Sequence, residues 1–163
     1  MPPTTAHETR DNMGVRLTFR IATLVSVASA SAPAATDLVQ LDPFAPATAG
    51  IAACPTAKPR LWTVDEMRTE AHVRSERGTR CALEGTCEPG GAYKRDVEIN
   101  ERVRAAIAAD PRFADTSVWV TTSRKWVTLK GCVRKSAQRK AMVSLVTQQP
   151  NVERVFDELT LGR

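Results

Sequence analysis

The four cysteines of this 163-residue chain are its side chains with the clearest capacity for covalent chemistry. Cys81 and Cys87 flank a short loop that contains Gly85, so they are the natural local pair for a disulfide in an oxidising compartment. The partners of Cys54 and Cys132 are left open, and the alternative is four reduced thiols in a cytosolic protein. No pair has Cys-x-x-Cys spacing, which argues against a zinc site.

Catalytic residues are not indicated anywhere in the sequence. The chain has two histidines, and neither is placed as the base of a cysteine nucleophile. His72 is interpreted as a surface residue of a helix, because no His or Cys stands four residues away. No acid–base pair or phosphate-binding loop is recognisable. We therefore expect no enzymatic activity, no cofactor and no metal site.

A second group of residues has the chemistry to bind an anion. The formal net charge is +5, and residues 93–163 carry 14 Lys/Arg against 8 Asp/Glu, so the positive charge lies in that part of the chain. Seven basic residues and no acid occur between Arg124 and Lys140. Such a run is either a solvated face or a surface that attracts a polyanion. The residues expected to contact lipid or another anion are Arg124, Lys125, Lys130, Arg134 and Lys135, together with Trp119 and Trp126.

These residues belong to a predicted β-hairpin at residues 118–131. Apolar and polar residues alternate on both sides of a short polar break, which predicts two half-buried strands. Pairing Val118 with Leu129 makes Ser123 and Arg124 the loop and turns both tryptophans outward. The break lacks an Asn-Gly or Gly-X dipeptide, so a slipped or longer loop is the alternative.

Helical patterns and a further strand surround the hairpin. Thr63 and Glu66 have the spacing of a capping box, and Gly78 is a natural stop for that helix. Asp96 is a possible N-cap of the next helix. The predicted helices are 62–78, 96–109 and 136–149, and the last strand is 152–161, in which Asp157 breaks the apolar parity and is expected at a bulge or an edge.

The first 35 residues have the features of a signal peptide. Arginines precede a short apolar run, residues 21–28, and small residues follow it, so we expect cleavage between about Ala30 and Ala35. Met13 is an alternative start, and a disordered terminus or a buried helix is the alternative structure. Ile51-Ala-Ala-Cys54 resembles a lipidation motif but lies too far from the apolar run, which argues against an outer-membrane lipoprotein.

Composition divides the rest of the chain into three parts. Residues 36–61 are rich in Pro and Ala and are interpreted as an extended linker. Residues 62–92 contain the capped helix and the Cys81–Cys87 loop. Residues 93–163 form the domain that holds the hairpin, with the element order helix, strand, strand, helix, strand.

The last part resembles the BON domain, a small module of bacterial envelope proteins. The pattern Val118-x-Val120 followed by Val127-x-Leu129-x-Gly131-x-Val133 is similar to the hairpin of that family, and one copy covers about residues 93–161. Asn151 departs from a usual glycine, and Asn is the residue that best replaces glycine at positive φ. The resemblance implies an α+β fold, a three-stranded sheet with two helices on one face, and makes Gly131 a structural glycine where strand and helix pack closely.

The resemblance also implies non-enzymatic work in the periplasm, with binding to phospholipid and a role under osmotic or membrane stress. An anionic membrane surface is one expected partner, and an envelope protein is the alternative. Export argues against nucleic acid as the ligand. The tryptophans support membrane contact only if no second layer covers them, and the 62–78 helix or a partner could supply such a layer.

Overall fold

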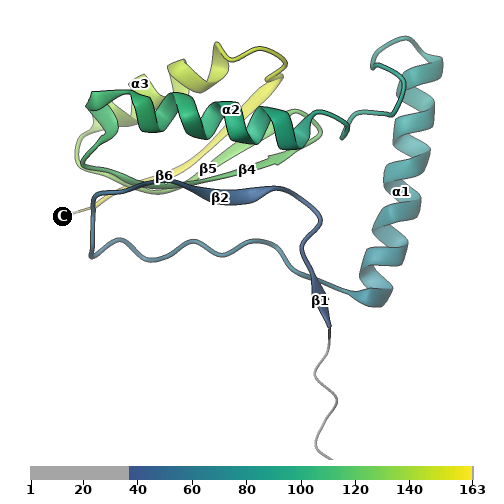
Figure 1. Cartoon of the computed structure of the whole chain (residues 1–163), viewed down its shortest axis with the longest axis horizontal. Coiled ribbons are helices and arrows are strands. Elements are labelled where there is room, and N and C mark those ends of the chain that lie inside the picture. The colour runs from purple at the N-terminus through teal and green to yellow at the C-terminus, as the bar shows by residue number, and fades with distance from the viewer. Residues whose placement is uncertain (1–36, 163) are drawn as a thin grey trace, which may run out of the picture. The chain divides into compact units, whose positions relative to one another are not determined.

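A mixed four-stranded sheet forms the centre of the computed structural model, which describes residues 37–162. Strands β4 (Ser117–Ser123) and β5 (Trp126–Val133) form the antiparallel hairpin, and β6 (Arg154–Leu161) runs parallel to β5. Strand β2 (Phe44–Ala49) pairs antiparallel with β4, so the strand order is β2-β4-β5-β6 (Figure 1). The expected signal peptide lies outside the described residues.

The fourth strand corrects the expected three-stranded sheet. β2 lies within the segment interpreted as a linker, and only Phe44 and Thr48 of its sequence Phe-Ala-Pro-Ala-Thr-Ala favour a strand, because Pro and Ala are depleted in strands. Pro46 has no backbone N–H to donate to a neighbouring strand, and it is accommodated because β2 is an edge strand with a neighbour on one side only. The α+β class and the element order of residues 96–161 are as expected.

The register of the hairpin differs from the expected one by two residues. Val118 faces Gly131 and Val120 faces Leu129, so that Arg124 and Lys125 form the turn. Both turn residues have positive φ, 57° and 63°, as a two-residue type I′ turn requires. A shift of two residues equals the side-chain period of a strand, so the inward and outward faces are the ones predicted.

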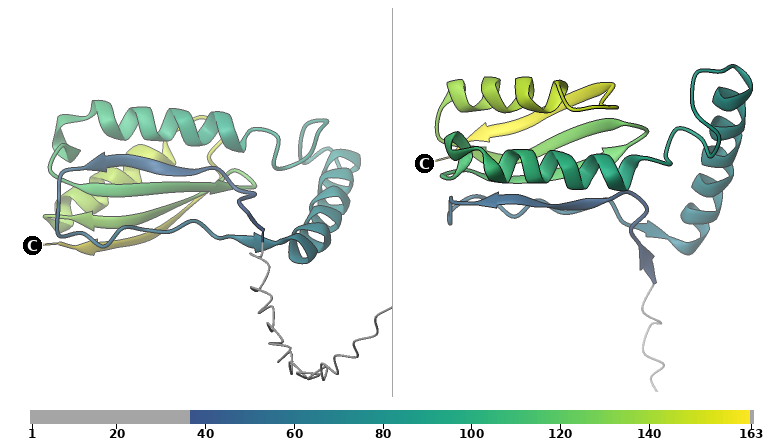
Figure 2. Two further views of the ribbon diagram at one scale, coloured as in Figure 1. Left: turned by 60° about the horizontal axis from the view of Figure 1, so that its bottom comes forward. Right: turned by 45° about the horizontal axis from the view of Figure 1, so that its top comes forward.

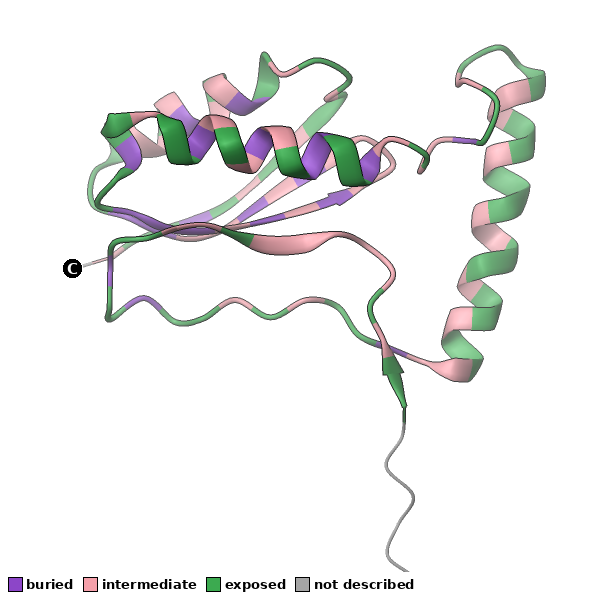
Figure 3. Cartoon of the chain, in the orientation of Figure 1, coloured by how far each residue is buried: buried purple, intermediate pink, exposed green. Residues whose placement is uncertain are grey.

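Two helices cover one face of this sheet (Figure 2). They are α2 (Asp96–Ala109) and α3 (Ser136–Thr147), and a short 3-10 turn, η1 (Pro111–Phe113), follows α2. Figure 3 shows the buried positions recurring along α2. The core is made of Ile99, Val103, Ile107, Phe113, Val118, Val120, Val127, Leu129, Val133, Met142, Val146 and Leu159.

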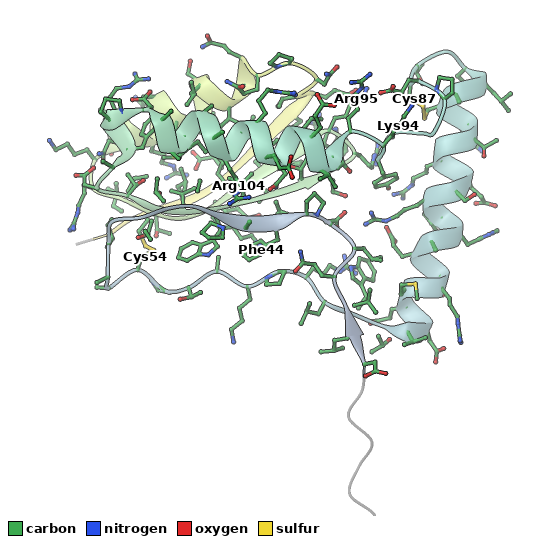
Figure 4. All side chains as sticks on the ribbon, viewed as in Figure 1. Phe44, Cys54, Cys87, Lys94, Arg95 and Arg104 are labelled. Carbon is green, nitrogen blue, oxygen red and sulfur yellow. A yellow bond between two sulfur atoms is a disulfide. The ribbon has the colours of Figure 1, made fainter. Side chains whose placement is uncertain are left out.

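Both edges of the sheet are covered by polar side chains. On β6, Asp157 accepts from the Leu159 amide at 3.1 Å and from Arg139 Nε of α3 at 2.7 Å. On β2, the Pro46 carbonyl accepts from Arg104 Nε of α2 at 2.8 Å (Figure 4). Asp157 therefore breaks the apolar parity because it covers an edge, and these contacts oppose the addition of a further strand.

Helix α1 (Val64–Leu83) lies between β2 and α2 in the chain and is longer than expected. The capping box forms: Thr63 Oγ1 accepts from the Glu66 amide at 3.3 Å, and Glu66 Oε2 accepts from the Thr63 amide at 2.8 Å. Gly78 does not end the helix. Its role is close packing, since a Cβ on Gly91 would lie 2.7 Å from the Gly78 Cα. The short strands β1 (Leu38–Val39) and β3 (Trp62–Thr63) pair next to the helix start.

The structure contains two disulfides. One joins Cys81 and Cys87, the local pair expected from the sequence. The other joins Cys54 to Cys132, so the sulfur of Cys54 is not free to carry a lipid. No helix among residues 37–162 has the length and hydropathy needed to cross a membrane.

Candidate anion-binding site at the hairpin tip

The two outward tryptophans of the hairpin have different surroundings. Trp119 packs against Ile51, Cys54 and Cys132, so the segment after β2 and its disulfide form a second layer over it. Trp126 lies next to the turn and meets Phe156 of β6 edge to face, with ring centroids 5.7 Å apart. The second layer considered for both tryptophans therefore exists at Trp119, but residues 51–54 supply it rather than α1.

Two arginines lie close to the Trp126 ring. The Cζ atom of Arg124 lies 4.3 Å from the ring centroid, and that of Arg154 lies 5.1 Å from it. Arg154 is the register partner of Trp126 on β6 and also lies 5.9 Å from the Phe156 ring. These are cation–π distances, at which the aromatic ring attracts the guanidinium. We call Arg124, Trp126, Arg154 and Phe156 the tip cluster.

Other basic residues of the run 124–140 lie outside the tip cluster, because they form ion pairs or lie away from the turn. Three of them face carboxylates of β6 or of the turn before it. Arg134 and Lys135 follow β5 and therefore lie at the opposite end of the sheet from the turn. The run is thus divided between the two ends. The ion pairs are Lys125–Glu153 at 3.1 Å, Lys130–Glu158 at 3.3 Å and Arg139–Asp157 at 2.7 Å.

Asp96 holds the turn that presents Arg124. Its carboxylate accepts from the Arg124 amide at 2.8 Å and from the Lys125 amide at 2.7 Å, and the residue is buried. Left-handed backbone costs about 1 kcal/mol at each non-glycine residue, and these two hydrogen bonds offset that cost. Burial raises the pKa of Asp96 above its usual value, while the two amide hydrogen bonds act in the opposite direction. The expected N-cap role is wrong: Asp96 is the first helical residue, and its side chain serves the turn.

A buried side-chain amide, that of Asn100, holds the hairpin near its turn. Asn100 Nδ2 of α2 donates to the Val120 carbonyl at 3.1 Å, to Thr122 Oγ1 at 3.2 Å and to the Pro43 carbonyl at 3.2 Å. The Thr122 amide also donates to the Pro43 carbonyl at 3.2 Å. Helix α2, the residue before β2 and strand β4 are therefore tied together next to the turn. These hydrogen bonds hold the strand that leads into the turn of Arg124 against the rest of the domain.

Gly131 lies toward the far end of β5, on the core-facing parity. Its φ is +131°, and a Cβ there would lie 2.1 Å from the Ser117 carbonyl oxygen. The glycine is therefore required by the close approach of β4, whereas the resemblance implied a close approach of the following helix. Gly131 is structural, as expected, but the segment that packs against it is β4.

Arg154 and Phe156 are the residues of the tip cluster that sequence reasoning missed. Arg154 lies outside the basic run, and Phe156 reads as one more apolar residue of the last strand. The alternation of β6 places both on the outward face. They lie next to Trp126 because β6 pairs parallel with β5 in this register, and the sequence alone does not give that pairing.

Comparison with known proteins identifies the domain that carries the tip cluster. Residues 95–163 match the family model described as BON domain. No curated protein and no solved structure matches the chain. The match covers α2 through β6 and excludes β2, α1 and both short strands.

Proposed function

We propose that this chain, whose residues 95–163 form a BON domain, is a non-enzymatic periplasmic envelope module that binds an anionic phospholipid surface through its hairpin tip. A domain of this family indicates an envelope module related to osmotic stress, and such domains generally bind rather than catalyse. In this proposal, the bound module supports envelope integrity when osmotic or membrane stress disturbs the bilayer.

The tip cluster is the observation that carries the proposal. Arg124 and Arg154 form no ion pair with any carboxylate among residues 37–162, whereas Lys125, Lys130 and Arg139 do. Tryptophan favours the headgroup region of a bilayer, and each basic residue near an anionic surface contributes about 1 kcal/mol. An aromatic pair with two uncommitted cations at one end of a sheet has the chemistry of a membrane contact.

Cosedimentation with vesicles tests this function. The full chain without its signal peptide is mixed with phosphatidylcholine vesicles that contain or lack phosphatidylglycerol. Changing Arg124 and Arg154 to Gln should lower the affinity for the anionic vesicles about tenfold or more, because the contact loses two charges. The matched control changes Arg134 and Lys140 to Gln, which removes the same charge from exposed positions away from the tip.

The expected outcome is a much smaller loss in the control pair than in the tip pair. Equal losses would mean that the net charge of the protein alone attracts it to the vesicle. That result, or the absence of binding by the wild-type protein, would overturn the proposal. The difference between the pairs should also shrink as salt is raised, because salt screens exposed charges.

Protein interaction is a second candidate function, and helix α1 is the feature that favours it. None of its 20 residues is buried, and the Cys81–Cys87 disulfide closes its end. A shallow groove between α1 and the following turn is lined by Gly78, Thr79, Ala82, Pro89 and Gly90. Crosslinking from α1 in intact envelopes to a single protein, together with no response to vesicles, would support this function in place of membrane binding.

A further inference from the structure

We infer that the tip cluster is a discrete phosphate site, in which Arg124 and Arg154 together hold the phosphate group of one phospholipid while Trp126 and Phe156 contact its apolar part. The inference rests on the proposed membrane binding and goes further. It names a ligand group and a stoichiometric site, where the proposed function requires only a favourable surface.

The hydrogen-bonding capacity of the two arginines is the first step. A guanidinium carries five N–H donors in a planar fork that matches the oxygens of a phosphate. Among the residues that the structure describes, neither the Arg124 nor the Arg154 side chain donates a hydrogen bond to a protein acceptor or forms an ion pair. All of these donors are therefore directed to solvent or to a ligand. By contrast, Arg139 and Arg104 donate to the protein itself.

The positions of the two guanidiniums are the second step. Their Cζ atoms lie 4.3 Å and 5.1 Å from the same Trp126 centroid, so they are less than 10 Å from each other. Arg124 belongs to a turn whose amides donate to Asp96. Arg154 lies on β6 as the register partner of Trp126. Contact with the rings limits the rotamers of both side chains. A phosphate would therefore meet two donors whose ordering cost is partly met before binding.

The acidic groups near the tip are already occupied, which is the third step. Glu153 lies beside Arg154 in sequence, but its carboxylate takes Lys125 Nζ at 3.1 Å. Asp96 lies beneath the turn and accepts from the turn amides. Neither carboxylate competes with a phosphate for the two arginines.

The rings decide that the ligand is a lipid. Phe156 is 38% exposed, which is high for a large apolar side chain, and Trp126 is half-buried against it. Free phosphate would use the arginines and leave these rings in water. A phospholipid uses both parts of the cluster, because its glycerol and acyl groups can lie on the rings while its phosphate meets the guanidiniums.

Replacing both arginines by lysine separates this inference from general charge attraction. Arg124→Lys with Arg154→Lys keeps the charge but removes the planar forks and weakens the contact with the rings. The inference predicts about tenfold weaker binding to phosphatidylglycerol vesicles, because bidentate donors are lost. Arg68→Lys with Arg80→Lys is the matched control at two exposed positions of α1, and it should bind as the wild type does. Equal urea midpoints for all three proteins confirm that folding is unaffected.

A second measurement asks for saturable binding in solution. The Trp126 indole resonance is followed by NMR while a short-chain phosphatidylglycerol, glycerol phosphate or inorganic phosphate is added. The lipid should give a saturable shift at the lowest concentration, and inorganic phosphate should bind least tightly. Equal affinity for inorganic phosphate and lipid would overturn the lipid assignment. Unchanged vesicle binding by the lysine variant would overturn the discrete site while leaving the proposed function standing, and no vesicle binding by the wild type would remove both.

Discussion

The outward face of the sheet has a closed end and an open end, and each contains a tryptophan of the hairpin. At the closed end, Trp119 lies against Ile51 and the Cys54–Cys132 disulfide. At the open end, Trp126 lies against Phe156 and two arginines that have no carboxylate partner among the described residues. The two residues share a strand pair and a face, yet only one is covered by another segment of the chain.

The contrast between the covered and the uncovered end suggests that one end stabilises the fold and the other binds a ligand. The closed end contains features that constrain the chain, namely a disulfide between residues 78 positions apart and a glycine that no other residue can replace without strain. The open end contains the Arg124 and Arg154 guanidiniums, which make no hydrogen bond to the described residues, and the partly exposed rings of Trp126 and Phe156. We therefore expect changes at the closed end to alter the free energy of unfolding, and changes in the tip cluster to alter binding.

The largest expected effect is that of Gly131→Leu at the closed end. The new Cβ would meet the Ser117 carbonyl oxygen at 2.1 Å, and φ of +131° is unfavourable for leucine. Backbone strain and overpacking together predict a loss of about 5 kcal/mol in the free energy of unfolding. The control Lys130→Leu changes an outward residue and should cost less than about 1 kcal/mol. Urea melts decide it, and equal losses would mean that the hairpin register is wrong.

Removing the Cys54–Cys132 disulfide is expected to have the next largest effect. The loop-entropy relation gives about 4.5 kcal/mol for a loop of this length, against about 2 kcal/mol for the loop closed by Cys81 and Cys87. Double serine variants of each pair are compared by urea unfolding. A larger loss from Cys81 and Cys87 would show that α1, rather than the closed end, limits stability.

Truncating the two tryptophans tests the comparison directly. Trp119→Ala removes a ring from a packed layer and should cost about 3 kcal/mol of stability with little change in vesicle binding. Trp126→Ala should cost less stability, because its ring meets Phe156 and two arginines instead of packing on a buried cluster, and it should weaken vesicle binding. Measuring urea midpoints and vesicle affinity for both variants gives the two effects. If both variants lose stability equally, or both lose vesicle affinity equally, the two ends do not have separate roles.

Local sequence patterns were sufficient for much of the domain. The period of 3.6 residues places α2 and α3, and the alternation of residues 118–131 gives the correct faces of the hairpin. The register was missed because Arg-Lys carries no preference for a type I′ turn. The turn depends on Asp96, which lies 28 and 29 residues away in the sequence, so no local pattern can reveal it.

The candidate site was predicted in part for the same reason. Charge and aromatic content pointed to Arg124 and Trp126, but the pairing of β5 with β6 brings Arg154 and Phe156 to them. The cover over Trp119 comes from a proline-rich segment with weak strand propensity, in which β2 was missed. Long-range pairing thus decides both which basic residues are free and which tryptophan is open.

The smallest expected effect concerns the pH dependence that Asp96 gives to the open end. Burial raises the pKa of Asp96 in the folded protein above the ordinary value of 3.8, which we take for the unfolded chain. The folded protein then binds this proton more tightly. The resulting stabilisation is fully present below the unfolded pKa and is lost as pH rises through the folded pKa. Asp96→Asn has no such proton, so the wild type should gain stability relative to the variant as pH falls toward 3.8.

Urea midpoints of both proteins at pH 7, 5 and 4 measure this effect. Glu66, Glu88 and Asp110 have lowered pKa values, so they remove stability in acid, but they are present in both proteins and cancel in the difference. The amide hydrogen bonds from Arg124 and Lys125 favour the charged carboxylate and oppose the effect of burial. If the difference instead moves toward the variant as pH falls, these two hydrogen bonds outweigh burial. The tip turn would then weaken in acid, and vesicle binding through Arg124 should weaken with it.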